Sequence, residues 1–248
     1  MVKYLLTAFF SLFLISCSTD SSEVDLVDVN NKNFPKGYFS TRYFTDSPDN
    51  KTVKFEFDAQ NRPIKRTIKL TSGATSTENV TYIGNSEYKI SQGNKVLETG
   101  TYQLKSFYNY AIIQKLISEK NGEISEYIYS DNKGDKVLTT KTTSKGGSII
   151  AEEVYTWDRN EKYPHLTNLE KVVRTDKVSE EITTTVFEYD TYQNPFIRLG
   201  IFDDDINYRH LSFNNFTKKT VTVVKNNIEI SKVEYESDFK YNKGRVIL

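Results

Sequence analysis

A degenerate repeat recurs along this chain of 248 residues and constrains its fold more than any other feature. Each copy has two aromatic residues separated by one residue, followed by Asp or another polar residue, a turn and an aliphatic residue. Residues two apart in a β-strand point to the same face of a sheet, so each pair can pack on neighbouring strands. The polar residue can hydrogen-bond back onto the turn. The five copies contain Phe55, Phe57 and Asp58; Tyr127 and Tyr129; Tyr155, Trp157 and Asp158; Phe187, Tyr189 and Asp190; and Phe239, Tyr241, Asn242 and Gly244.

The sequence around these copies alternates with the same period of two residues. Residues 182–189 and 220–224 are rich in Thr, Val, Ile, Phe and Tyr, which favour strands. Turn signals such as Asn121-Gly122 and Gly146-Gly147 separate the runs. Residues 106–120 could compete as a helix, but Asn121-Gly122 leads straight into another β run, which favours a strand. We predict an all-β fold, a repetitive antiparallel meander of about 12–15 strands that forms a curved single sheet or a partly open barrel.

Two of the copies resemble a known repeat. Residues 239–246, Phe-Lys-Tyr-Asn-Lys-Gly-Arg-Val, and residues 187–190, Phe-Glu-Tyr-Asp, resemble the tyrosine-aspartate (YD) repeat of RHS-type proteins. Residues 189–196 resemble a variant of this repeat found in bacterial lipoproteins. The copies are degenerate: Ser130 replaces the Asp of one, and the Trp157 copy lacks the glycine. Large RHS proteins wrap many repeats around a toxin, which needs a longer chain. The resemblance therefore implies a curved, repetitive antiparallel sheet and no delivery function.

The beginning of the sequence has the pattern of an export signal. Lys3 precedes an apolar run of twelve residues, Tyr4 to Ile15. This run is too short to cross a bilayer core of about 30 Å at about 1.5 Å per helical residue, and it has the length of a signal-peptide core. Leu14, Ile15, Ser16 and Cys17 resemble the lipobox of a bacterial lipoprotein. That resemblance implies cleavage before Cys17 and a lipid bound covalently to its sulfur, with no other cofactor. An ordinary cleaved signal followed by a free thiol is the alternative.

The expected organisation therefore has three segments. Residues 1–16 are a cleaved N-terminal lipoprotein signal peptide, residues 17–33 a lipidated cysteine with a flexible polar tether, and residues 34–248 a single all-β repeat domain. Two or more acyl chains would hold the chain firmly on a membrane. Ser18 behind the cysteine resembles the signal for the outer membrane, and the nearby Asp20 and Glu23 resemble a surface-export cue of some bacterial lineages. The periplasmic and surface faces both stay open.

Charge and motifs narrow the function classes. After cleavage the chain would carry 32 basic and 33 acidic side chains, because Lys3 is the single charged residue that is removed. We expect no nucleic-acid partner, since there is no basic excess. A single cysteine forms no intrachain disulfide. The sequence contains no Gly-x-Ser-x-Gly, His-Glu-x-x-His or phosphate-loop motif, so we do not expect an enzyme. A glycan-active hydrolase with two facing carboxylates stays open, because sequence cannot choose such a pair.

Two further groups of residues are weak site candidates. Asp203, Asp205 and Asn207 have the opening spacing of an EF-hand loop, but the glycine and the final glutamate of that loop are both missing. We therefore expect no metal site there. Aromatic side chains on an exposed sheet can stack on a sugar ring or on a protein partner, whereas buried ones form the core. The candidates for such stacking are Trp157, Tyr108 and Tyr110.

These patterns predict a membrane-anchored protein of the cell envelope, most simply of the outer membrane, that acts as a non-catalytic binding or structural module. The membrane would be contacted through the acyl chains on Cys17, and the partner would be a glycan or an envelope protein; the oligomeric state is open. The alternative is a periplasmic carrier that holds lipid or lipoprotein acyl chains in a curved sheet. A carrier should keep an apolar cavity open, whereas a binding module should fill its concave face with its own side chains.

Overall fold

The computed structural model describes residues 38–43, 51–60, 62–104, 111–132, 135–158, 167–202, 208–236, 240–242 and 245–247. The chain divides into two units, residues 1–32 and 33–248, and all described residues belong to the second. Within these ranges no helix has the length and apolar character needed to cross a membrane. Cys17, the three residues before it and the proposed tether lie outside the described residues.

Fourteen strands form one sheet in which each strand pairs with the next strand of the chain, always antiparallel. The predicted all-β antiparallel meander in a single sheet is thereby confirmed. Its strands are β1 (Tyr38–Tyr43), β2 (Lys51–Phe57), β3 (Pro63–Leu70), β4 (Thr75–Ile83), β5 (Glu87–Gln92), β6 (Lys95–Leu104), β7 (Ala111–Ser118), β8 (Glu123–Asn132), β9 (Asp135–Lys145), β10 (Ser148–Trp157), β11 (Leu169–Asp176), β12 (Glu181–Gln193), β13 (Asn214–Lys225) and β14 (Ile228–Glu236). Two short strands, β15 (Lys240–Asn242) and β16 (Arg245–Ile247), form a separate hairpin.

The tight turns at one end of the strands follow from the residues placed there. Gly122, Gly146 and Gly147 have positive φ, as do Asn226 and Asn227. Glycine adopts this conformation without steric cost, and asparagine tolerates it better than most residues. These reversals connect β7 to β8, β9 to β10, and β13 to β14. The segment that could have competed as a helix contains strand β7, as predicted.

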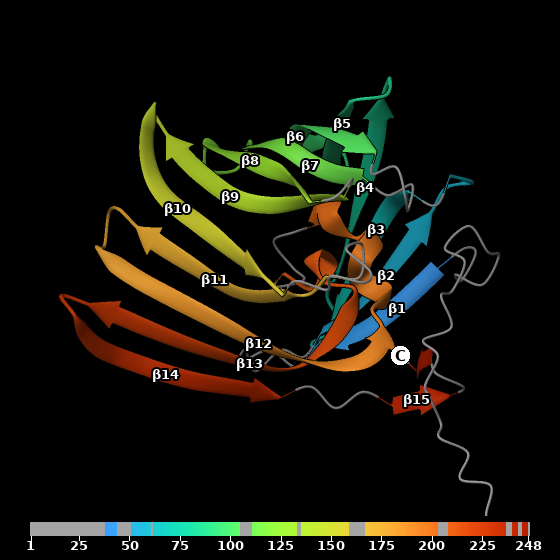
Figure 1. Ribbon diagram of the computed structural model, residues 1–248. Helices are drawn as coiled ribbons and strands as arrows, with labels where there is room; N and C mark the ends of the chain where they lie inside the picture. The colour runs from blue at the N-terminus through green and yellow to red at the C-terminus, as the bar shows by residue number, and fades with distance from the viewer. Residues whose placement is uncertain are drawn as a thin grey trace, which may run out of the picture. The chain divides into compact units, whose positions relative to one another are not determined.

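The sheet is strongly curved (Figure 1), and β-bulges accompany that curvature. A bulge adds one residue to one strand of a pair, which bends the strand and increases its twist. In strands β2, β6, β8, β10 and β12 the register with the following strand shifts just before an aromatic residue. These residues are Phe57, Tyr102, Tyr129, Trp157 and Tyr189. The repeat therefore coincides with the places where the sheet bends.

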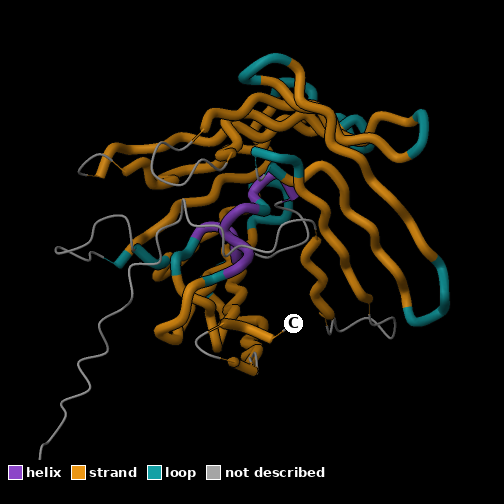
Figure 2. The backbone as a smooth tube through the Cα atoms, turned by 90° about the vertical axis from the view of Figure 1, so that its right-hand side faces the viewer, coloured by secondary structure: helices purple, strands orange, loops and turns teal. Residues whose placement is uncertain are grey.

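Side chains on the concave face form two buried clusters. Both aromatic residues of a repeat point to this face, and the first of each described pair is the more deeply buried. Phe55 belongs to a cluster over β2 and β4–β6, while Tyr127, Tyr155 and Phe187 belong to a cluster over β7–β13. Residues between the two aromatics point the other way: Ile128 on β8 is 58% exposed. The 3-10 segments of the described residues lie on the concave side (Figure 2).

The second aromatic residue of several repeats donates a hydrogen bond to the backbone of the preceding strand. The Tyr129 hydroxyl donates to the carbonyl of Ile113 at 2.7 Å, and the Trp157 indole Nε1 donates to that of Leu138 at 2.7 Å. The Tyr189 hydroxyl donates to the carbonyl of Leu169 at 2.6 Å. Tyr82, which lies outside the repeat copies, makes the same kind of contact with the carbonyl of Pro63 at 2.9 Å. Burial raises the pKa of Tyr82 and of Tyr189 above the ordinary tyrosine value, so both stay protonated donors at neutral pH.

The Asp that follows the second aromatic binds the backbone of the adjoining turn. Asp58 Oδ1 accepts the N–H groups of Gln60 and Arg62 at 2.9 and 2.8 Å. Asp190 Oδ1 accepts the N–H of Tyr192 at 2.9 Å. Asp158 Oδ1 accepts the N–H of Asn168 at 2.6 Å, across a longer loop. Short polar side chains with this geometry stabilise chain reversals.

Replacing Tyr129 by Phe should lower the free energy of unfolding by about 1–2 kcal/mol, because the buried carbonyl of Ile113 loses its hydroxyl donor. Urea unfolding followed by tryptophan fluorescence measures this change. Tyr192→Phe is the matched control, because Tyr192 is 39% exposed and water can replace its hydroxyl contacts. Equal losses in the two variants would show that the bond to the backbone contributes nothing specific.

Candidate functional site

A segment of twenty residues, 194–213, connects β12 to β13 and is called the insert below. Its described residues, 194–202 and 208–213, form the 3-10 elements η1 (Pro195–Arg198), η2 (Gly200–Phe202) and η3 (Arg209–Leu211). Asn194 joins its two ends. The Asn194 backbone N–H donates to the carbonyl of Phe213 at 2.8 Å, while its side-chain Nδ2 donates to the carbonyls of Arg209 and Ser212. Asn194 Oδ1 also caps η1 by accepting the N–H of Phe196 at 2.9 Å. The insert therefore leaves and re-enters the sheet at one fixed point.

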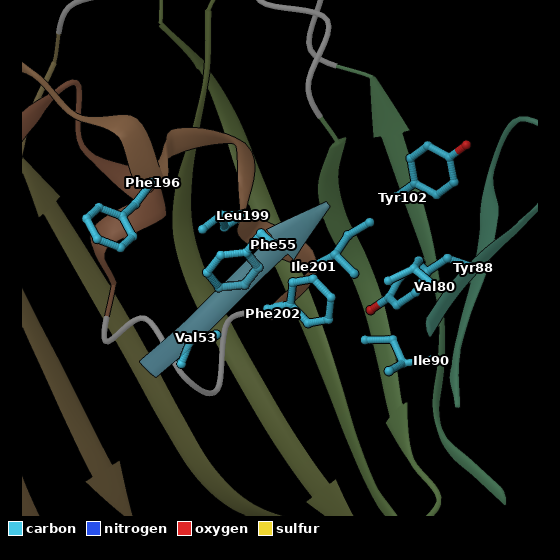
Figure 3. Packing of buried hydrophobic residues seen from close by; sticks show 10 residues of the cluster. All are labelled: Val53, Phe55, Val80, Tyr88, Ile90, Tyr102, Phe196, Leu199, Ile201 and Phe202. Atoms are coloured by element: carbon cyan, nitrogen blue, oxygen red, sulfur yellow. The ribbon is translucent and has the colours of Figure 1, made fainter. Parts of the chain in front are cut away.

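The first half of the insert fills the concave face of the N-terminal strands. Phe196, Leu199, Ile201 and Phe202 are each at most 2% exposed and join one buried cluster with side chains of β2 and β4–β6 (Figure 3). The rings of Phe202 and Phe55 lie 5.7 Å apart. The strand residues of the cluster are Val53, Phe55, Val80, Tyr88, Ile90 and Tyr102. Residues almost 150 positions apart in the chain thus share one core.

The second half of the insert packs on the C-terminal strands. Tyr208 precedes η3 and has a left-handed backbone, with φ of 67°. Its ring meets Tyr155 and Phe187 edge-on, at centroid distances of 6.2 and 6.0 Å. Leu211 packs against the same cluster. Edge-to-face contacts at these distances are favourable beyond simple burial of area, so Tyr208 acts as an anchor for this half.

An ion pair lies beneath each half of the insert. Under η2, Arg66 of β3 donates from Nε to Glu78 of β4 at 2.8 Å, and its guanidinium stacks 4.5 Å from the ring centre of Phe202. Arg66 is 5% exposed. Burying charges is costly unless they are paired and hydrogen-bonded. The pairing across the two strands satisfies that condition, and the planar guanidinium also contacts an aromatic face.

The second ion pair involves Glu153 of β10, which is 3% exposed. Arg174 of β11 donates to Glu153 Oε1 at 2.9 Å. The hydroxyl groups of Tyr155 and Tyr208 donate to Oε2 at 2.6 and 3.3 Å. Because Tyr208 belongs to the insert, this carboxylate hydrogen-bonds the insert to the sheet. Charge-assisted bonds of this kind are stronger than neutral ones.

A small pocket remains between the insert and strands β7–β10. It is lined by Ile197, His210 and Leu211 of the insert, together with Tyr129, Leu138 and Trp157 of the strands. Its volume is about 30 Å³, whereas a single water needs at least about 10–15 Å³ and ligand pockets occupy about 300–1,000 Å³. The pocket therefore has room for one or two waters, and an acyl chain does not fit into it.

Some of the predicted site residues lie among the described residues, and others lie outside them. Trp157 is half-buried against the core cluster of β7–β13, with its indole N–H on the backbone, so its side chain packs inward. Tyr241 and Asn242 belong to strand β15, but their side chains are not described. The remaining predicted residues lie outside the described ranges: Leu14, Ile15, Ser16, Cys17, Tyr108, Tyr110, Asp203, Asp205, Asn207, Phe239 and Gly244.

Sequence reasoning missed the insert as a structural element. Its first half is an apolar run, Pro195-Phe-Ile-Arg-Leu-Gly-Ile-Phe202, in which proline and glycine interrupt any strand or helix period. The sequence pattern places residues 189–196 in a variant of the repeat. The signal that could have identified the insert is the density of large apolar residues in a segment without alternation, since such a segment still has to be buried.

No protein-family model matches the chain, and no curated protein matches it. Among solved structures, the chain is similar to a porin-like protein from Bacteroides uniformis ATCC 8492. The two share 14% sequence identity with a TM-score of 0.46, over 80% of this chain and 93% of the other.

Replacing Phe202 by Ala should lower the free energy of unfolding by about 3–5 kcal/mol, because the large buried ring leaves a cavity and its stacking on Arg66 is lost. Thermal unfolding monitored by circular dichroism measures the loss. Val178→Ala is the control: Val178 is 76% exposed, so its truncation should change stability by no more than about 0.5 kcal/mol. A small loss for Phe202→Ala would mean that the insert does not contribute to the core.

Proposed function

We propose that this chain is a lipid-anchored protein of the cell envelope that acts as a non-catalytic binding or structural module. The observation that carries this proposal is the filled concave face. Phe196, Leu199, Ile201 and Phe202 occupy the hollow that a carrier would need to keep open. What the sheet offers to a partner is then its outward face and its edges, and the outward face holds exposed aliphatic side chains such as Ile128 and Val154.

The membrane anchor rests on the sequence, through the lipobox-like residues that end at Cys17. A polar segment of sixteen residues, 18–33, would separate the anchor from the sheet, and a segment of this composition acts as a flexible spacer. The anchor and the filled concave face are compatible, because the tether separates the lipid from the sheet. The proposed partner is a glycan or an envelope protein. The proposed location is the outer membrane, on either its periplasmic or its outer surface.

The contacts of the partly buried Glu78 and the buried Glu153 suit structural roles. Glu78 is bound by Arg66, and Glu153 is bound by Arg174 and two tyrosine hydroxyls. An arginine balances the charge of a carboxylate held this way. A catalytic acid instead needs a pKa raised by burial or by a neighbouring negative charge. These contacts favour the binding module over the glycan hydrolase.

Replacing Cys17 by Ala should move the protein from the membrane fraction to the soluble fraction of the envelope, because no sulfur remains to carry the lipid. Fractionation of cells that express each form measures the change. Ser18→Ala is the matched control and should stay in the membrane. Protease treatment of intact cells then decides whether the anchored form faces outward. If Cys17→Ala stays anchored with its signal cleaved, the anchor proposal is wrong.

The carrier alternative has its own test. The Cys17→Ala protein has no covalent lipid, so solvent extraction followed by mass spectrometry should recover far less than one fatty acid per chain. A carrier should instead yield about one bound lipid per chain, which would require the insert to leave the concave face. That outcome would contradict the role assigned to the insert without affecting the result on anchoring.

A further inference from the structure

A cage of oxygen atoms surrounds the side chain of Asn215 where β12 meets β13. The register of these two strands shifts between Tyr189 and Gln193, so the intervening residues leave the regular ladder and the carbonyls of Tyr192 and Gln193 turn toward β13. Asp190 lies in the same bulge. Asn215 Nδ2 is 3.3 Å from Asp190 Oδ2, 3.3 Å from the Tyr192 carbonyl oxygen and 3.4 Å from the Gln193 carbonyl oxygen.

These three contacts are poor hydrogen bonds. An amide nitrogen has two protons for three acceptors, and all three distances exceed the usual 2.9–3.0 Å. The other arm of the same amide, Asn215 Oδ1, is buried and has no hydrogen-bond partner among the described residues. Asn215 is 1% exposed. Buried amides normally make hydrogen bonds through both the nitrogen and the oxygen, whereas the Asn215 oxygen makes none with the described residues.

The neighbouring asparagine shows what a satisfied amide looks like at this end of the sheet. Asn214 Oδ1 accepts the Asn168 side-chain Nδ2 at 2.9 Å, and Asn214 Nδ2 donates to the Tyr192 carbonyl at 3.2 Å. Each arm of Asn214 therefore meets a group of the opposite kind. Asn215 places its donor among three oxygens and leaves its Oδ1 without a hydrogen-bond partner among the described residues. With the amide turned over, Oδ1 would be a fourth oxygen beside those three.

We propose that Asp190, the carbonyls of Tyr192 and Gln193, and Asn215 bind a calcium ion. Rotation of the Asn215 amide by about 180° would bring Oδ1 to the three oxygens, and carboxylate, carbonyl and amide oxygens are the ligands of Ca²⁺. Water completes the shell, since Asp190 is partly exposed. Mg²⁺ fits less well because it requires near-ideal octahedral geometry at about 2.0–2.1 Å. Because the site has one carboxylate, its dissociation constant for Ca²⁺ should be about 10⁻⁴–10⁻³ M, as in extracellular modules.

Thermal unfolding of the full chain with CaCl₂, MgCl₂ or a chelator tests the site. At 10 mM CaCl₂ the melting temperature should rise by about 3–8 °C over the chelator, from the linkage between binding and stability, and MgCl₂ should give a clearly smaller rise. Asp190→Asn should abolish the rise. Asp158→Asn, the same position in the neighbouring repeat, should keep it. The proposal is wrong if the wild-type chain shows no rise, or if Asp190→Asn keeps it.

Asn215→Asp separates a calcium site from a merely structural amide. The change removes the donor and adds a second carboxylate oxygen facing Asp190, so this variant should melt below the wild type in chelator. Calcium should then raise its melting temperature by more than it raises that of the wild type, because ligand charge increases affinity. A loss of stability that calcium does not restore would assign Asn215 a structural role and overturn the proposal.

Discussion

A single sheet of fourteen strands can be stable in water only if something covers its concave face, and in this chain the cover is the insert between β12 and β13. The insert places Phe196, Leu199, Ile201 and Phe202 against strands from the other end of the sheet. Burial of large side chains is the main favourable term in folding. The buried core of the N-terminal strands and the stacking of Phe202 on Arg66 both follow from this contact.

The repeat creates the hollow that the insert fills. At Tyr129, Trp157 and Tyr189 the register shifts, the strand bends and the aromatic side chain reaches the backbone of the preceding strand. Repetition of this device across alternate strands turns local bends into a continuous curve. A repeat that resembles a sequence motif of much larger proteins is therefore used here as a means of curving one sheet around its own chain.

The sequence predicted what is periodic and missed what is not. Alternation, turn residues and the aromatic pairs predicted the antiparallel meander, because each of them reports on one strand or one hairpin. The insert has no period, and the ion pairs join residues 12 and 21 positions apart that face each other only in the paired strands. The cage around Asn215 depends on one bulge. Trp157 could be read either as exposed or as core, and only its packing decides between them.

The position of the insert also predicts an order for folding. Its apolar side chains contact β2 and β4–β6, which lie more than ninety residues earlier in the chain, so they can be buried only after those strands have paired. Contacts of this sequence separation have a high loop-closure cost and slow the folding of β-proteins. Local hairpins can form first because each joins consecutive strands. The insert then covers the concave face of a sheet that is already curved. Its two halves pack onto the sheet at the same time, because Asn194 holds both ends of the insert.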